Sequence, residues 1–344
     1  MINMFCCADC FDDKYLKEEV FPYLDGKIGK CSFCGSEDTK LIEPIKLQEQ
    51  FELLTGIYSE DPDGKTLVEW LKADWALFPN DKLDNHQSRS LLIEILNDGE
   101  IVRKKFSYPS YISLYTDEAE RWQLFRSELM HSNRYFPNEF IDLEQLEELL
   151  GHLLTTEKDV PNEWFRARIQ LDSTSYAKEQ MGSPPKHLAS HGRANPAGIP
   201  YLYLASTAQT AVSEIRPHTG EKITVAQFTL NEPQLIADLR HPKKTVSPFL
   251  IGDEEKIKKT RNYINFLEEL GNELTRPVLP RSAAFDYAPS QYLCEFIKKC
   301  KYTGVMYSSS VGDGFNLALF DPNSAIAKST FQQTVTKVSV SIEN

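Results

Sequence analysis

The spacing of apolar residues predicts helices through most of residues 41–155. In the segment DGKTLVEWLKADWALF, leucine and tryptophan recur at intervals that place them near one helical face. The segments RSLLIEIL and DLEQLEELLGHLL repeat this spacing. Leucine and tryptophan on one helical face pack in a core far more often than they bind a ligand. We therefore expect these faces to form a core.

A further helix is predicted over TDEAERWQLFRSELM. Thr116 suits the N-cap position, and two acidic residues follow it in the first turn, where the helix dipole favours negative charge. Trp122, Phe125 and Leu129 then fall on one face of the helix.

The pattern changes to that of strands near TTEKDVP, residues 155–161. Short strand-like runs follow it, namely WFRARIQ, YLYLAS, KITVAQFTL, QLIADL, GVMYSS and NLALF. Two helical segments lie between them, DEEKIKKTRNYINFLEELGNEL and SQYLCEFIKKC. Strands that do not alternate strictly with helices predict an α+β fold. The tail QTVTKVSVSIE alternates like an exposed strand.

The composition indicates a packed and acidic protein, with 41% hydrophobic residues and a net charge of −12 over 344 residues. Such a charge repels polyphosphate backbones, so nucleic acid is not an expected partner, although a local basic pocket for a small phosphorylated ligand stays open. No apolar run approaches the roughly 20 residues that span a bilayer. The N-terminus MINMFCCADC lacks the basic segment and long apolar core of a secretion signal. We therefore expect a cytoplasmic protein without a membrane partner, whose cysteines are reduced or metal-bound.

Four cysteines have the spacing of a zinc ribbon. Cys7 and Cys10 form one C-x2-C pair, and Cys31 and Cys34 form a second pair 20 residues later. Each pair aims two thiolates at one point, so two pairs complete a tetrahedral set of four sulfur ligands. A closed site of this kind stabilises a fold and has no open position for catalysis. Cys6 is an alternative first ligand, although the C-x2-C spacing favours Cys7.

Arginines and tyrosines gather in two neighbouring motifs. WFRARIQ places Arg166 and Arg168 on one strand face, because side chains alternate with period two. Arg193 lies in the turn of HGRANPAGIPYLYLAS. Arginines brought close together repel each other unless an anion holds them, and guanidinium groups pair bidentately with phosphate oxygens. Tyr201 and Tyr203 share a strand face and could stack on a planar ring.

A carboxylate and a run of serines complete the candidate site. Glu214, in AVSEIRP, could stabilise an oxocarbenium-like transition state or position a nucleophile. The strand end YSSS contains Ser308, Ser309 and Ser310, whose hydroxyls could hold phosphate or ribose. These groups together suit a ligand with a pyrophosphate, a ribose and a flat ring, such as NAD. No G-x-G-x-x-G motif is present, so a Rossmann site for hydride transfer is not expected.

The ordered motifs FRAR, GRANPAGIPYLYLAS, AVSEIRP, GVMYSSS and NLALF resemble the RES domain, a family named for its arginine, glutamate and serine. The resemblance covers about residues 160–325. Known members are bacterial toxins that degrade NAD, some of them by phosphorolysis, and their fold resembles that of ADP-ribosyltransferases. The resemblance therefore implies an NAD glycohydrolase or an NAD phosphorylase, which would use inorganic phosphate as its second substrate.

The family motifs also imply residue roles in cleavage of the nicotinamide–ribose bond. The first family arginine falls on Arg166, with Arg168 as its neighbour, and the second falls on Arg193. Arg166 and Arg193 would hold the pyrophosphate. The family tyrosine falls on Tyr203, which would contact the nicotinamide riboside. The family glutamate falls on Glu214, which would stabilise the charge that develops on the ribose.

The family serine falls on Ser309 or Ser308, since the run of serines leaves the register open. Asn316, before the last strand, accompanies that serine.

The N-terminal half resembles the cysteine-knuckle, helical domain found ahead of RES or HEPN toxin domains in bacterial defence proteins. Short RES toxins are single domains that pair with a small antitoxin. The long N-terminal extension departs from that pattern and could restrain the toxin in cis or sense a trigger. An antitoxin or other regulatory partner and a homo-oligomer both stay open.

These patterns predict that the chain is divided into four parts. We predict a zinc ribbon at residues 1–40, a helical domain at 41–157, an α+β RES catalytic domain at 158–330, and a C-terminal tail or edge strand at 331–344.

Three other functions compete with NAD cleavage. The same fold could act as an ADP-ribosyltransferase on a macromolecule, or the zinc ribbon and helices could form a non-catalytic sensor or scaffold. A ribonuclease of the HEPN kind carries an arginine and a histidine four to six residues apart on a helix, as Arg126 and His131 are in RSELMH.

Overall fold

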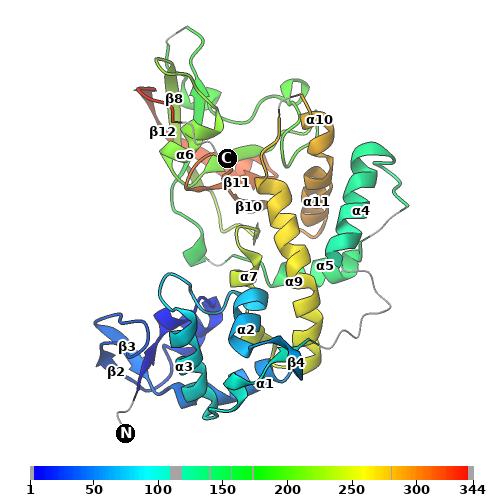
Figure 1. Ribbon diagram of the computed structural model, residues 1–344. Coiled ribbons are helices and arrows are strands. Elements are labelled where there is room, and N and C mark those ends of the chain that lie inside the picture. The colour runs from blue at the N-terminus through cyan, green and yellow to red at the C-terminus, as the bar shows by residue number, and fades with distance from the viewer. Residues whose placement is uncertain are drawn as a thin grey trace. The chain divides into compact units, whose positions relative to one another are not determined.

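The computed structural model in Figure 1 describes residues 4–108, 118–138, 141–155, 157–172, 174–279 and 281–339. The chain forms two compact units, Met1–Arg121 with His241–Glu268, and Trp122–Arg240 with Glu269–Asn344. The predicted N-cap Thr116 lies outside the described residues. The four predicted domain ranges remain a prediction. The two compact units reflect contacts between residues and do not test these boundaries.

The first unit begins with a small antiparallel sheet. Its strands are β1 (Cys6–Cys7), β2 (Lys27–Gly29) and β3 (Thr39–Ile42), in the order β1-β3-β2. A 3-10 turn at Ala8–Cys10 follows β1 directly, so the first two cysteines of the predicted zinc ribbon lie at the end of a strand and in the tight turn after it.

Helices with well-defined N-termini make up most of the rest of the first unit. These are α1 (Gln48–Thr55), α2 (Leu67–Trp75), α3 (Asn85–Leu96), α7 (Pro242–Thr245) and α8 (Pro248–Ile251). Capping boxes start α2 at Thr66 with Glu69, and α3 at Asp84 with Gln87. The predicted helices over DGKTLVEWLKADWALF and RSLLIEIL are therefore confirmed. The pairing of β4 (Ser59–Lys65) with β5 (Phe106–Ser107) was not predicted, because β4 is polar and carries no apolar alternation.

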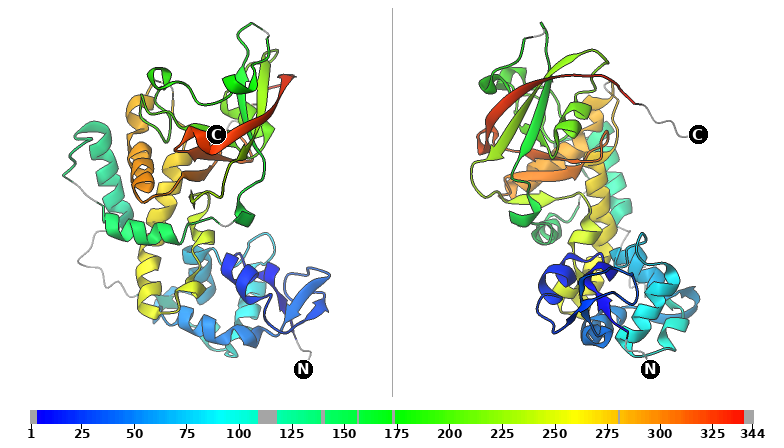
Figure 2. Two further views of the ribbon diagram at one scale, coloured as in Figure 1. Left: turned by 180° about the vertical axis from the view of Figure 1, so that it is seen from behind. Right: turned by 90° about the vertical axis from the view of Figure 1, so that its left-hand side faces the viewer.

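The second unit contains a seven-stranded sheet in the order β12-β8-β6-β7-β11-β10-β9. Its strands are β6 (Trp164–Ile169), β7 (Leu202–Ala205), β8 (Lys222–Leu230), β9 (Ile236–Asp238), β10 (Gly304–Ser308), β11 (Phe315–Leu319) and β12 (Ala325–Thr334). All neighbours are antiparallel except β9 and β10. Five of the six predicted strand-like runs contain one of these strands, and the sixth, NLALF, overlaps all of β11 except Phe315. The C-terminal strand lies earlier than the alternation in QTVTKVSVSIE predicts, and it runs along β8 at one edge of the sheet (Figure 2).

The two faces of this sheet pack differently. One face buries Trp164, Leu204, Met306 and Leu317 in a large apolar cluster. The other face carries small residues, including Ala167 and Ala205, against which α6 (Ala208–Glu214) packs. Small side chains under α6 bring the helix close to the strands, and this places the last residue of α6 near the sheet.

The remaining helices of the second unit are α5 (Leu143–Gly151), α10 (Ala283–Asp286), α11 (Ala288–Lys299) and most of α4 (Glu118–His131), whose first residues belong to the first unit. Helix α9 (Glu254–Thr275) contributes residues to both units. Trp122, Phe125 and Leu129 are each at most 1% exposed, which confirms that they share a buried face. Short 3-10 helices occur at Pro44–Leu47, Ile101–Arg103, Glu157–Asp159, Lys178–Gln180, Lys186–Leu188 and Pro322–Ser324, and a short π-helix at Leu16–Val20.

Helices and strands that do not alternate strictly along the chain confirm the predicted α+β class. Within the described ranges, every helix is too short or too polar to cross a bilayer.

Candidate functional site

A pocket of about 280 Å³ lies in the second unit. Strands β6, β7, β10 and β11, helix α6 and the turn at Gly192–Arg193 all contribute residues to its lining. Among the predicted site residues, the structure places five in the lining: Arg166, Arg193, Tyr203, Glu214 and Asn316. The fold therefore brings together motifs that are up to 150 residues apart in the chain.

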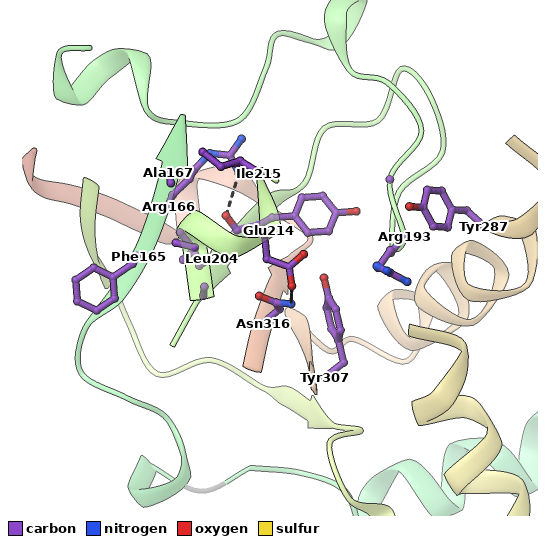
Figure 3. Close-up of a pocket in the computed structure, with 14 residues that line it drawn as sticks. Phe165, Arg166, Ala167, Arg193, Leu204, Glu214, Ile215, Tyr287, Tyr307 and Asn316 are labelled. Carbon is purple, nitrogen blue, oxygen red and sulfur yellow. Dashed lines mark hydrogen bonds between the residues drawn. The ribbon is translucent and has the colours of Figure 1, made fainter. Parts of the chain in front are cut away.

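Glu214 is held at the pocket by one of its two carboxylate oxygens. It is the last residue of α6, whose N-cap Thr207 accepts a hydrogen bond from the Thr210 amide. Oε1 of Glu214 accepts from the Ser309 hydroxyl at 2.7 Å and from the Asn316 side-chain amide at 2.6 Å. Within the described chain, Oε2 has no hydrogen-bond partner. The carboxylate is thus oriented through Oε1, and Oε2 stays available to a ligand (Figure 3).

The guanidinium of Arg193 is positioned from several sides. Nη1 donates to the main-chain oxygen of Arg276 at 2.5 Å, and Nη2 donates to the Ser310 hydroxyl at 3.2 Å. The ring of Tyr287 lies 5.7 Å from the guanidinium carbon. A guanidinium has more N–H donors than these two bonds use, so Arg193 can still pair with an anion.

The turn that carries Arg193 is locked by a tyrosine and an asparagine. The Tyr203 hydroxyl donates to Asn195 Oδ1 at 2.7 Å and accepts from the Ala194 amide at 3.0 Å. Burial raises the pKa of Tyr203 above its ordinary value, which keeps its hydroxyl protonated. A Cβ on Gly192 would approach Asn195 Oδ1 and the Tyr203 hydroxyl to 2.3 and 2.5 Å, so a larger residue here would disrupt the hydrogen bonds of the turn.

Helix α11 supports the same turn through two adjacent polar residues. Ser290 is fully buried, and its hydroxyl donates to the Arg193 oxygen at 2.6 Å. The side-chain amide of Gln291 donates to the oxygens of Gly192 and Asn195 at 2.9 and 3.0 Å. Helix α11 therefore pairs three main-chain oxygens of the turn and supports the conformation that Tyr203 and Asn195 also hold.

Arg166 has a buried donor that the protein does not use. Its Nη1 donates to the Tyr203 oxygen at 2.9 Å, whereas its Nε is buried without a partner among the described residues. Burial, with the nearby charge of Arg168, lowers the pKa of Arg166 to about 10, so the group is still charged at neutral pH. A buried unpaired donor costs on the order of 1–3 kcal/mol, and an anion in the pocket would remove that cost.

Comparison with protein families gives a match to the RES domain over residues 163–337. This chain belongs to the RES-domain family. Among solved structures, a chain of the MbcT–MbcA toxin–antitoxin complex of M. tuberculosis is similar at 14% identity and a TM-score of 0.31, over 56% of this chain and 94% of that one. No curated protein matches the chain. The resemblance of the N-terminal half stays a prediction, because the family match begins at residue 163.

Four predicted ligand contacts of the RES domain, Arg168, Tyr201, Ser308 and Ser309, are absent from the pocket lining. Arg168 donates to the Gly182 oxygen at 2.8 Å. Tyr201 is buried, and its hydroxyl donates to Glu295 on α11 at 2.7 Å. Ser308 donates toward the Arg240 oxygen at 3.5 Å, whereas its neighbour Ser309 bonds to Glu214.

Sequence reasoning missed two tyrosines of the RES pocket. Tyr307 and Tyr287 both line it. Tyr307 precedes the serine run in YSSS, so its position in a recognised motif was a usable signal. Tyr287 lies between α10 and α11, far from any motif, and no sequence signal marked it.

The arginine and histidine of the ribonuclease alternative have structural partners in the second unit. Nε of Arg126 donates to Glu273 at 2.5 Å, and that carboxylate also pairs with Arg276 at 3.3 Å. The ring of His131 lies 5.7 Å from the ring of Phe285. The guanidinium of Arg126 is therefore engaged in an ion pair with the buried carboxylate of Glu273.

In the first unit, the four predicted cysteine ligands converge. The Sγ atoms of Cys7, Cys10, Cys31 and Cys34 all lie within 4.8 Å of one another, and the first three residues are buried. The Cys7–Cys34 and Cys10–Cys31 sulfur distances are both 3.4 Å, close to the ~3.8 Å edge of a tetrahedron of sulfur atoms around zinc.

Hydrogen bonds from Cys10 and Cys7 lower the pKa of Cys31, which favours its thiolate. Cys6 lies outside this group of four. The donor set and its geometry fit a structural zinc ion, which would cross-link the β1 turn to the Cys31–Cys34 segment.

Proposed function

We propose that this RES-domain protein cleaves the nicotinamide–ribose bond of NAD. The observation that carries the proposal is the orientation of Glu214. Ser309 and Asn316 hold its Oε1, and Glu214 lines a pocket that two arginines also line. A fixed carboxylate stabilises the positive charge that develops on a ribose when its leaving group departs.

The arginines supply the binding part of the proposed reaction. Arg193 has unused donors, and Arg166 has a buried Nε without a protein partner. Both features suit the pyrophosphate of NAD, whose oxygens accept bidentate hydrogen bonds from guanidinium groups.

Tyr203 contributes in two ways. Its ring lines the pocket, where it can contact the nicotinamide riboside, while its hydroxyl is committed to the turn that carries Arg193.

Product analysis tests the proposal and distinguishes hydrolysis, phosphorolysis and ADP-ribosyl transfer. Purified protein is incubated with NAD, with and without inorganic phosphate, and the products are identified by mass. Free ADP-ribose indicates hydrolysis, a phosphorylated ADP-ribose formed only with phosphate indicates phosphorolysis, and ADP-ribose on a macromolecule indicates transfer. Glu214→Gln is the matched control, since it keeps the shape of the side chain and loses its charge. Intact NAD in the wild-type reaction would contradict the proposal.

A further inference from the structure

Tyr307 lies beside the carboxylate that the proposed reaction uses. It is in β10, its side chain is 3% exposed, and it lines the pocket. It lies directly opposite Asn316 in the antiparallel pairing of β10 with β11. Residues directly opposite each other in such a pair present neighbouring side chains on one face of the sheet. Since Asn316 binds Glu214, Tyr307 is placed next to that carboxylate, and Figure 3 shows its hydroxyl end directed toward Glu214.

The hydroxyl of Tyr307 lacks a hydrogen-bond partner among the residues that the structure describes. The hydroxyl of Tyr203, by contrast, is bonded to Asn195, and that of Tyr201 to Glu295. A tyrosine hydroxyl on a nearly buried side chain normally finds a partner. Burial, together with Tyr203 and Glu214 nearby, raises the pKa of Tyr307 well above its ordinary value. The group therefore stays protonated and remains a donor.

The chemistry of the two unpaired groups identifies the kind of ligand group that fits them. Tyr307 offers an O–H donor, and Oε2 of Glu214 offers an acceptor. A hydroxyl both donates and accepts, so it can satisfy both groups at once. A phosphate group carries only acceptors when ionised, and the Glu214 carboxylate would repel it. Phosphate therefore belongs at the guanidinium of Arg193.

We propose that Tyr307 is a substrate-contacting residue that binds a hydroxyl of the nicotinamide-side ribose. The phenol donates its hydrogen to that hydroxyl, which in turn donates to Oε2 of Glu214. This inference rests on the proposed cleavage of NAD, and it adds a residue that orients the ribose at the reacting carbon.

A ligand–residue double-mutant cycle tests the contact. Tyr307→Phe removes one hydrogen bond and leaves the ring in place, so we expect kcat/KM for NAD to fall about tenfold. The same comparison is made with NAD analogues that lack the 2′- or the 3′-hydroxyl of the nicotinamide-side ribose. For the analogue that lacks the contacted hydroxyl, wild type and Tyr307→Phe should have equal kcat/KM, because the interaction is already absent.

Tyr302→Phe is the matched control. Tyr302 is half-buried, precedes β10 and does not line the pocket, so its variant should behave as wild type with all three substrates. An equal loss for Tyr307→Phe with NAD and with both analogues, or no loss at all, would overturn the inference while leaving the proposed function intact.

If the wild type binds NAD without cleaving it, the proposed function fails. The same double-mutant cycle is then carried out with dissociation constants, measured by calorimetry, in place of kcat/KM. If it neither binds nor cleaves NAD, both proposals fail.

Discussion

The hydroxyl of Ser290 donates to the main-chain oxygen of Arg193 at 2.6 Å, which joins the first turn of α11 to the turn of the candidate site. Ser290 is fully buried, and its neighbour Gln291 pairs with two further carbonyls of that turn. A residue outside the pocket therefore helps to position an arginine of the pocket.

Replacement of Ser290 by alanine should displace Arg193 without unfolding the protein. One lost hydrogen bond changes the free energy of unfolding by about 1 kcal/mol, whereas a misplaced guanidinium weakens its contact with the ligand. We expect the KM for NAD to rise about five- to tenfold with little change in kcat. Steady-state kinetics measure this. An unchanged KM in Ser290→Ala would show that Ser290 supports only the fold.

Arg193 and Glu214 should affect different kinetic constants. Arg193→Lys replaces a planar fork with a point charge, so we expect the KM for NAD to rise about ten- to a hundredfold. Glu214→Gln removes a charge that matters mainly in the transition state, so it should lower kcat by a larger factor than it weakens NAD binding. Kinetics combined with calorimetry separate the two effects. Tight NAD binding by Arg193→Lys would contradict a role in holding the pyrophosphate.

The cysteine cluster should bind about one zinc ion per chain. Cys31→Ser removes one of the four converging sulfur ligands, so both the metal content and the melting temperature should fall. Cys6→Ser is the control, because Cys6 is buried beside the cluster but outside it, and its variant should keep its zinc. Elemental analysis and thermal unfolding measure both. A wild-type protein of full stability without zinc would refute the site.

Glu273 should stabilise the second unit more than an exposed carboxylate does. Its side chain is 5% exposed and pairs with both Arg126 and Arg276. Glu273→Gln weakens hydrogen bonds to charged groups, so we expect a loss of roughly 1.5–3 kcal/mol in the free energy of unfolding. Glu100→Gln, which removes an exposed partner of Arg103, should cost under about 1 kcal/mol. Denaturant titration compares the two, and equal losses would contradict the prediction.

Asp13 should make the first unit less stable as the pH rises. Burial raises the pKa of this carboxyl from 3.8 to about 6. The folded protein therefore holds the proton more tightly than the unfolded chain does. The resulting stability is fully present below pH 3.8 and is lost as the pH rises through about 6, in total roughly 3 kcal/mol.

Asp13→Asn does not titrate but retains an oxygen that can accept from the Leu16 amide. The variant should therefore become more stable relative to the wild type between pH 5 and pH 8, which means that the difference between their free energies of unfolding increases. Denaturant unfolding at the two pH values measures the difference, and a relative stability that falls with pH would contradict the assignment.

Local sequence patterns predicted the longer helices, six of the seven sheet strands of the second unit and the groups that carry chemistry. Helical spacing found α2, α3 and α4, because a buried face imposes its period on the residues that form it. The paired C-x2-C motifs likewise predicted the convergence of Cys7, Cys10, Cys31 and Cys34, because each motif positions its own two sulfur atoms.

Only the tertiary structure decided how these groups are used. Period-two alternation placed Tyr201 with Tyr203, yet the hydroxyl of Tyr201 bonds to Glu295 on α11 and Tyr201 does not line the pocket. The pairing of β10 with β11 selected Tyr307 for the pocket, and the hydroxyl of Ser309 was committed to Glu214. These outcomes depend on the strand order and on helices packed from distant parts of the chain. A sequence motif specifies which side chains are available, but the contacts among separate elements determine which of them face the ligand.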